Sequence, residues 1–65
     1  MSFAENLKRL RKELKIGQQD LSKVINVSTK TISHWETGYT EPSINQLIAL
    51  ANFFDITIDE LVDKQ

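Results

Sequence analysis

The sequence predicts an all-α protein, a compact bundle of five helices with no strands. Apolar residues recur at intervals of three and four positions along most of the chain, the spacing that places them on one side of a helix. At three expected helix starts, a Ser or Thr is followed three residues later by Glu or Gln, the capping-box pattern. The connections are short, and no linker or repeat interrupts them. We therefore expect one domain that spans residues 1–65.

The first helix is expected to begin almost at the N-terminus, where Ser2 and Glu5 form a capping box. Its inner stripe repeats at alternating intervals of four and three residues: Phe3, Leu7, Leu10 and Leu14. Lysines and arginines occupy the remaining faces. This basic cluster is only a moderate indication of an anionic partner, because solvated lysines are common on helix exteriors.

Residues 17–38 are predicted to form two short helices joined by a tight turn. Gly17 is the expected N-cap of the first, whose inward residues follow an i, i+3, i+4 spacing: Leu21, Val24 and Ile25. Asn26 follows at a position where a left-handed backbone suits Gly best and Asn next best. Ser28 is a good N-cap for the second helix, and Gly38 marks its end.

The second of these helices has two dissimilar sides. Ile32 and Trp35 fall on one side. The opposite side carries only hydrogen-bonding side chains: Thr29, Lys30, Ser33, His34 and Thr37. A helix anchored by two strong apolar residues is suited to presenting its polar face to a partner, although an ordinary solvated surface has the same pattern. For Trp35, core packing fits better than base stacking, because the residue is in phase with Ile32.

Two further helices are expected after Pro42, which disfavours helical geometry in the residue before it. Ser43 and Gln46 form the capping box that opens the next helix. That helix is apolar around much of its circumference and is expected to be the most buried: Ile44, Leu47, Ile48, Leu50, Ala51 and Phe54. A capping box at Thr57 and Glu60 starts a short last helix, with Ile58, Leu61 and Val62 as its apolar residues.

The composition argues against several classes of function. The chain has no Cys and a single His, which excludes thiolate nucleophiles, cysteine-based zinc sites and paired-histidine metal sites. No catalytic residue, metal site or cofactor is therefore expected, and the carboxylates are more simply explained as helix caps. No apolar run approaches the length of a membrane span, and the N-terminus lacks a signal-peptide core. We expect a cytoplasmic protein that is not an enzyme, with no membrane or small-molecule partner.

The charges are unevenly distributed along the chain. The formal net charge of −1 argues against a general binder of polyanions. Residues 1–37, however, carry seven basic and four acidic side chains, a net of +3, whereas residues 38–65 carry one basic and five acidic side chains, a net of −4. This asymmetry indicates one face turned toward an anion, although a short chain can divide its charges this way by chance.

The stretch GQQDLSKVINVSTKTISHWETG, residues 17–38, resembles the helix-turn-helix of the phage-repressor and Cro-like (Xre-type) family of bacterial transcription regulators. The resemblance covers nearly the whole chain and is carried by a combination of positions: Gln18, Val27-Ser28, Ile32, Trp35-Glu36, Gly38, Pro42-Ser43 and Ile58-Asp59-Glu60-Leu61. Ser22 and Asn26 stand where Ala and Gly are usual, and both fit the same backbone. The resemblance implies a lambda-repressor-like DNA-binding domain, a sequence-specific regulator that acts as a repressor, with residues 29–37 as the recognition helix in the major groove of double-stranded DNA.

The resemblance also assigns contacts to particular residues. Gln18, at a helix start, is implied to contact a DNA phosphate, and four residues are implied to face base edges: Thr29, Lys30, Ser33 and His34. Further phosphate contacts are expected from nearby hydroxyls: Ser28, Thr37, Tyr39 and Thr40. Lys30 is long enough to reach guanine N7 and O6, and a Thr methyl can meet a thymine methyl. The alternative for His34 is a solvated surface imidazole.

The loop after residue 37 leaves two questions open. The Tyr39 hydroxyl could reach the phosphate backbone, or its ring could cover the edge of the core. The charge of Glu41 opposes a phosphate, so backbone N–H groups of residues 38–40 are expected to carry a contact there.

Two further expectations concern ion pairing and assembly. In this family an Arg and a Glu at the positions of Arg11 and Glu36 commonly form an ion pair between the first and third helices, and we expect a partly buried pair here. Such domains usually bind as two-fold pairs on half-sites of a palindromic operator, so a homodimer is expected. Its candidate interface residues, which could instead complete the monomer core, are Phe53, Ile58 and Val62.

Two rival functions remain at this stage. The first is a protein-interaction module, such as the antitoxin half of a toxin–antitoxin pair, whose acidic C-terminal half holds a partner. The second is a purely structural helical domain that binds nothing.

Overall fold

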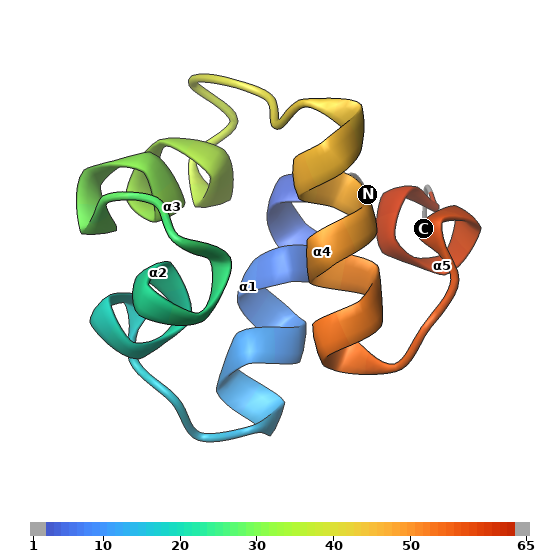
Figure 1. Ribbon diagram of the computed structural model, residues 1–65, viewed down its shortest axis with the longest axis horizontal. Helices are drawn as coiled ribbons and strands as arrows, with labels where there is room; N and C mark the ends of the chain where they lie inside the picture. Colours follow the sequence, from blue (N-terminus) through green and yellow to red (C-terminus); the bar gives the residue numbers. More distant parts are fainter. Residues whose placement is uncertain (1–2, 64–65) are drawn as a thin grey trace.

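The computed structural model describes residues 3–63 and contains five helices: α1 (Phe3–Glu13), α2 (Gln18–Ile25), α3 (Thr29–Glu36), α4 (Ile44–Phe54) and α5 (Ile58–Val62). No strand occurs within that range, so the predicted all-α class and the number of helices are confirmed. In the view of Figure 1, α2 and α3 lie on one side of α1 and α4, and α5 lies on the other. α3 packs against α1 and α2, and α5 packs against α1 and α4. No helix in the described part of the chain has the length and apolar character needed to cross a bilayer.

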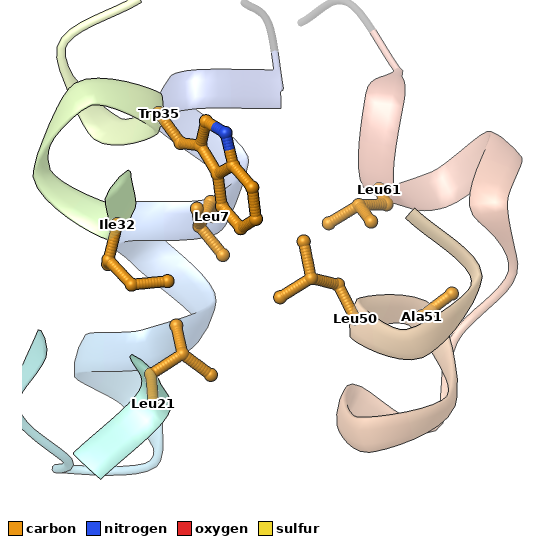
Figure 2. Packing of buried hydrophobic residues seen from close by; sticks show 7 residues of the cluster. All are labelled: Leu7, Leu21, Ile32, Trp35, Leu50, Ala51 and Leu61. Atoms are coloured by element: carbon orange, nitrogen blue, oxygen red, sulfur yellow. The ribbon is translucent and has the colours of Figure 1, made fainter. Parts of the chain in front are cut away.

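Every helix contributes to one small core. Its buried apolar residues are Leu7, Leu21, Ile32, Trp35, Leu50, Ala51 and Leu61, and Figure 2 shows them converging from opposite sides of the molecule. Trp35 is the largest of them and meets the ring of Phe3 edge-on, with 6.2 Å between ring centroids. The expectation that Trp35 packs in the core is therefore confirmed, and its indole is not available for base stacking.

The helix ends predicted from the sequence are present. Ser28 Oγ accepts the Thr31 N–H at 3.0 Å at the start of α3. Both described capping boxes, Ser43 with Gln46 and Thr57 with Glu60, have their two reciprocal hydrogen bonds. Ser2, half of the third predicted box, lies outside the described residues.

The predicted left-handed turn residue is also found. α2 begins after Gly17 and ends at Asn26, which has φ of 65°. Gly38, with φ of +78°, follows α3. Most side chains disfavour this region of backbone conformation, so Asn26 and Gly38 are residue types that suit these two helix ends.

Two residues predicted to point inward on α1 and α2 are exposed instead. Leu14 lies beyond the end of α1, because Lys15 adopts φ of 59° and turns the chain away. Val24 is also exposed: the face of α2 toward α3 is centred on Leu21, Ser22 and Ile25, and Val24 lies about 100° from that centre.

The expectation that α4 is the most buried helix is wrong, since four of its eleven residues are exposed, against two of the eight residues of α3. Leu50 and Ala51 are buried, but Ile44 is 69% exposed and Ile48 is also exposed. The apolar composition of α4 exceeds what its neighbours cover, because α4 packs mainly on α5 and, to a lesser degree, on α2.

The role of Asn6 was not apparent from the sequence. This side chain is buried, and its Nδ2 donates to the backbone oxygens of Leu61 at 2.9 Å and Asp63 at 2.8 Å. The last carbonyls of a helix have no partner within the helix. Asn6 therefore supplies donors at the end of α5 and ties the first helix to the last.

Candidate nucleic-acid interface

α2 and α3 approach each other closely because a small residue lies between them. Ser22 is buried, its Oγ donates to the Gln19 carbonyl at 2.7 Å, and the same oxygen lies 3.4 Å from Thr29 Oγ1. A larger side chain at Ser22 would push the start of α3 away from α2. The relation between the two helices is thus fixed by packing at Ser22 and by the buried residues Leu21 and Ile32.

The side of α3 opposite Ile32 and Trp35 carries Thr29, Lys30, Ser33 and His34, which we call the recognition face. Thr29 and Lys30 are exposed, and Ser33 and His34 are half-buried. The His34 ring meets the Tyr39 ring edge-on, with 4.8 Å between centroids and 61° between planes. Tyr39 is 76% exposed, so the alternative in which its ring covers the core is wrong.

The loop after α3 uses most of its own hydrogen-bond donors. The His34 carbonyl accepts the N–H of Tyr39 at 2.9 Å, the N–H of Thr40 at 3.4 Å and the Thr37 hydroxyl at 3.2 Å. The Gly38 N–H donates to the Trp35 carbonyl at 3.2 Å. The expectation that the amides of residues 38–40 remain for a phosphate is therefore wrong, and within residues 38–40 the donors left are the Tyr39 and Thr40 hydroxyls. Glu41 is exposed.

Ser28 caps the start of α3 through its side-chain hydroxyl. Its Oγ accepts the Thr31 N–H and lies 2.9 Å from the Thr31 hydroxyl. When Ser28 accepts from both donors, its own hydroxyl hydrogen is left to point outward, since a hydroxyl has two lone pairs and one hydrogen.

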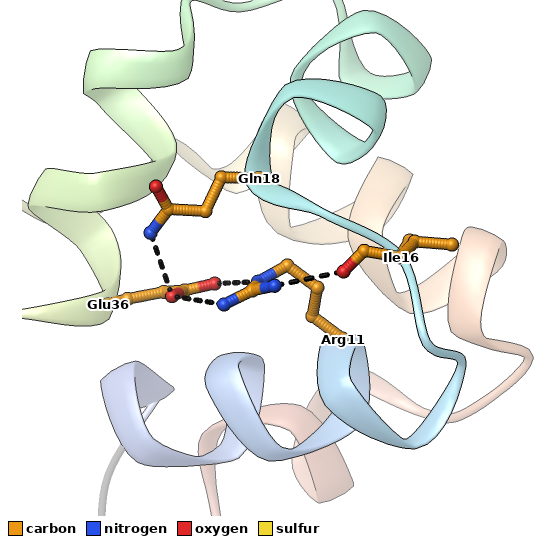
Figure 3. A network of polar contacts seen from close by, with 4 residues as sticks. All are labelled: Arg11, Ile16, Gln18 and Glu36. Carbon is orange, nitrogen blue, oxygen red and sulfur yellow. Dashed lines mark hydrogen bonds and ion pairs between the residues drawn. The ribbon is translucent and has the colours of Figure 1, made fainter.

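Arg11, Gln18 and Glu36 meet between α1, α2 and α3 (Figure 3). Arg11 Nε donates to Glu36 Oε2 at 2.6 Å, and Arg11 Nη2 donates to Glu36 Oε1 at 3.1 Å. The ion pair expected from the resemblance is thus present, with only 12% of the Arg11 side chain and 4% of the Glu36 side chain exposed. Arg11 Nη1 donates to the Ile16 carbonyl at 2.9 Å, and Gln18 Nε2 donates to Glu36 Oε1 at 3.1 Å.

The guanidinium of this pair stays charged. Its hydrogen bond to Glu36 raises the pKa of Arg11, and the negative charge of Glu36 acts in the same direction against the lowering effect of burial. The cation is therefore a permanent part of the junction between the three helices.

Comparison with known proteins identifies the family. The family model described as helix-turn-helix matches residues 7–61. This chain belongs to the helix-turn-helix family. The resemblance noted from the sequence is confirmed, and the matched region contains all five helices except the first residues of α1 and the last of α5.

Similar proteins are known in sequence and in structure. The HTH-type transcriptional activator BcrR of Enterococcus faecalis is 39% identical over 65 residues, all of this chain and 32% of BcrR. A transcriptional regulator from Listeria innocua superposes with a TM-score of 0.91 at 43% identity, over 97% of this chain and 59% of that one. The c2 repressor of phage P22, solved in complex with a synthetic operator, superposes with a TM-score of 0.92 at 35% identity, over 100% of this chain and 98% of that one.

The three residues expected at the dimer interface of this helix-turn-helix protein differ in exposure. Phe53 and Ile58 are partly buried and pack against the core, and Phe53 meets the Phe54 ring edge-on at 5.1 Å. Val62 is exposed. Much of the surface of Phe53 and Ile58 is therefore buried within the monomer, which is the alternative considered for these residues.

Proposed function

We propose that this helix-turn-helix protein binds double-stranded DNA in a sequence-specific manner and regulates transcription as a repressor, with residues 29–37 in the major groove. The observation that carries the proposal is the two-sided structure of α3. Ile32 and Trp35 fix one side in the core, and the opposite recognition face consists of polar side chains that are exposed or half-buried. The close superposition on the P22 c2 repressor, a protein solved with an operator, supports the same function.

The recognition face offers distinct contacts to base edges. Lys30 can donate to N7 and O6 of guanine, and the Thr29 methyl can pack on a thymine methyl. Ser33 and His34 can each donate or accept one hydrogen bond. Tyr39 lies against His34 and limits the positions that the imidazole can take.

The proposed phosphate contacts surround this face. They are Gln18 on α2, Ser28 and Thr37 at the two ends of α3, and Tyr39 and Thr40 in the following loop. Thr37 must exchange its bond to the His34 carbonyl for a phosphate, since its hydroxyl has one hydrogen. The net charge of +3 over residues 1–37 favours the approach of DNA to this half of the chain.

A homodimer on a palindromic operator completes the proposal. One recognition helix touches few base pairs, and two-fold pairing on half-sites about one helical turn apart supplies the missing affinity. Val62 is the most available of the three candidate interface residues. The chain is proposed to work in the cytoplasm without enzymatic activity or cofactor, because DNA recognition requires neither and the chain holds one His and no Cys.

Selection of binding sites from a random duplex library tests the function. The wild type should return one preferred, two-fold symmetric sequence. Equal binding to selected and random duplexes would instead favour the protein-interaction module, and no binding would favour a structural domain. Sedimentation on the selected duplex then counts the subunits, and one subunit on a non-palindromic site would rule out the dimer.

Lys30→Ala tests the assignment of the recognition face. It should flatten the preference at one operator position, by about 1–3 kcal/mol of discrimination. Lys23→Ala is the matched control, because it removes the same charge from an exposed position of α2. If Lys30→Ala keeps the wild-type profile at every position and loses only overall affinity, Lys30 contacts a phosphate and the assignment is wrong.

A further inference from the structure

Glu36 occupies a place in the fold that a purely structural ion pair does not require. Its carboxylate accepts two hydrogen bonds from Arg11 on α1 and a third from Gln18, the first residue of α2. Gln18 is one of the proposed phosphate contacts, and Glu36 is the last residue of α3, the proposed recognition helix. The buried pair is therefore bonded directly to a side chain of the interface.

The carboxylate fixes which way the Gln18 amide faces. Gln18 Nε2 lies 3.1 Å from Glu36 Oε1, and an amide turned by 180° would place its own oxygen against a carboxylate oxygen. That arrangement is repulsive, so the nitrogen faces inward and the amide oxygen points away from the pair, as Figure 3 shows. One hydrogen of Nε2 is held by Glu36, and the second remains to donate to a phosphate.

The carboxylate is itself held at two points. Arg11 contacts both of its oxygens and also donates to the Ile16 carbonyl in the connection between α1 and α2. Since only 4% of the Glu36 side chain is exposed, water does not compete effectively for these bonds. The carboxylate that accepts from Gln18 is therefore already fixed in the free protein, before DNA binds.

We infer that Glu36, held by Arg11, is a positioning residue for DNA binding: it orients the Gln18 amide so that this side chain donates to a phosphate without first being ordered. The inference rests on the proposed function and extends it to a residue that does not touch DNA. Ordering one flexible side chain at an interface lowers affinity by about 2- to 10-fold. Loss of the carboxylate should weaken DNA binding by that factor, through Gln18.

Glu36→Gln is the informative substitution. The introduced amide has one acceptor oxygen, which the Arg11 guanidinium takes, and its NH2 group no longer favours the nitrogen of Gln18 over the oxygen. Glu13→Gln is the matched control, because it also removes one negative charge, but from an exposed pair in which Arg9 Nη1 lies 3.3 Å from Glu13 Oε2. Gln19→Ala controls for Gln18→Ala at a neighbouring, exposed glutamine.

The experiment is a double-mutant cycle in DNA affinity. Wild type, Gln18→Ala, Glu36→Gln and the double variant are titrated against the selected duplex, at a temperature where circular dichroism shows all four to be folded. Glu36→Gln should weaken binding about 2- to 10-fold in the wild-type background and leave it unchanged in the Gln18→Ala background, with Glu13→Gln and Gln19→Ala near wild type. An equal loss in both backgrounds would overturn the inference and leave the proposed function intact. A wild type without sequence preference would instead remove the proposed function itself.

A second measurement needs no folded variant of Glu36. In NMR spectra of the wild type, the two side-chain amide hydrogens of Gln18 should differ clearly in chemical shift, unlike those of the exposed Gln19. The hydrogen bonded to Glu36 should be protected from exchange in the free protein, and the second hydrogen should become protected on DNA. Gln18 amide signals that match those of Gln19 in the free protein would overturn the inference.

Discussion

Glu36→Gln should also destabilise the fold far more than a surface substitution of the same chemistry. Removal of one partner from a buried ion pair costs about 3–5 kcal/mol, because the remaining charge stays desolvated. The introduced amide keeps one of the two acceptor oxygens that now receive three hydrogen bonds, so we expect a loss of about 2–4 kcal/mol. For a chain of this length, whose total stability is about 3–10 kcal/mol, this loss lowers the melting temperature by about 10–30 °C.

Thermal unfolding followed by circular dichroism measures this effect, with Glu13→Gln as the control. The Arg9–Glu13 side chains are 52% and 60% exposed, so loss of that pair should cost no more than about 0.5 kcal/mol. Arg11→Gln should resemble Glu36→Gln. If the buried-pair and control variants lower the melting temperature by the same few degrees, the Arg11–Glu36 pair contributes no more than a solvated one and the reasoning from burial fails.

The pH dependence of this contribution has a definite sign. The pKa of Arg11 is raised in the folded protein by the hydrogen bond to Glu36. A raised pKa gives a stabilisation that is complete at every pH below the range where an arginine loses its proton, and that is lost only above it. As far as Arg11 is concerned, the stability difference between wild type and Glu36→Gln should be equal at about pH 6.5 and about pH 9.

Asn6→Ala should lower the free energy of unfolding, measured in urea, by about 1–3 kcal/mol, because the carbonyls at the end of α5 lose their buried donor. Asn45→Ala, at an exposed helical position, should change it little. Equal effects of the two substitutions would contradict the proposed role of Asn6. Lys15→Gly should stabilise by about 1 kcal/mol because Lys15 has φ of 59°, and Asn26→Gly should gain less because Asn tolerates this conformation better. Melting temperatures rank the last two, and the reverse order would show that backbone strain is not the cause.

The features that the sequence predicted well are local. A capping box such as Ser43 with Gln46 is complete within four residues, so its side chains and backbone need no other part of the fold. The same holds for Asn26, whose left-handed conformation follows from the end of α2 alone. The Arg11–Glu36 pair, by contrast, was expected only from the resemblance to a family, since the two residues are 25 positions apart.

The features that the sequence did not indicate depend on contacts between distant segments. Asn6 donates to carbonyls 55 and 57 residues away, and nothing in its own helix signals that role. Ile44 and Val24 follow helical spacing, yet they are exposed because too few elements pack over those faces. A periodic pattern identifies which residues share a side of a helix, but the partner that covers that side is decided by the tertiary fold.

At the candidate site, too, the residue types follow from the sequence, but whether their hydrogen-bonding groups are available depends on the fold. Hydroxyls and amides near the end of α3 are the right groups for phosphate contacts, but the His34 carbonyl already accepts three donors from this loop. The proposed phosphate contacts that remain, Gln18 above all, are neutral side chains. Their contribution to DNA affinity depends on the direction in which their donor hydrogens point. Neutral contacts release no counterions of their own, so affinity at this interface depends on how well each donor is oriented before binding. If Gln18 contacts a phosphate as proposed, the buried carboxylate of Glu36 supplies that orientation, since a misoriented amide has no net charge with which to compensate.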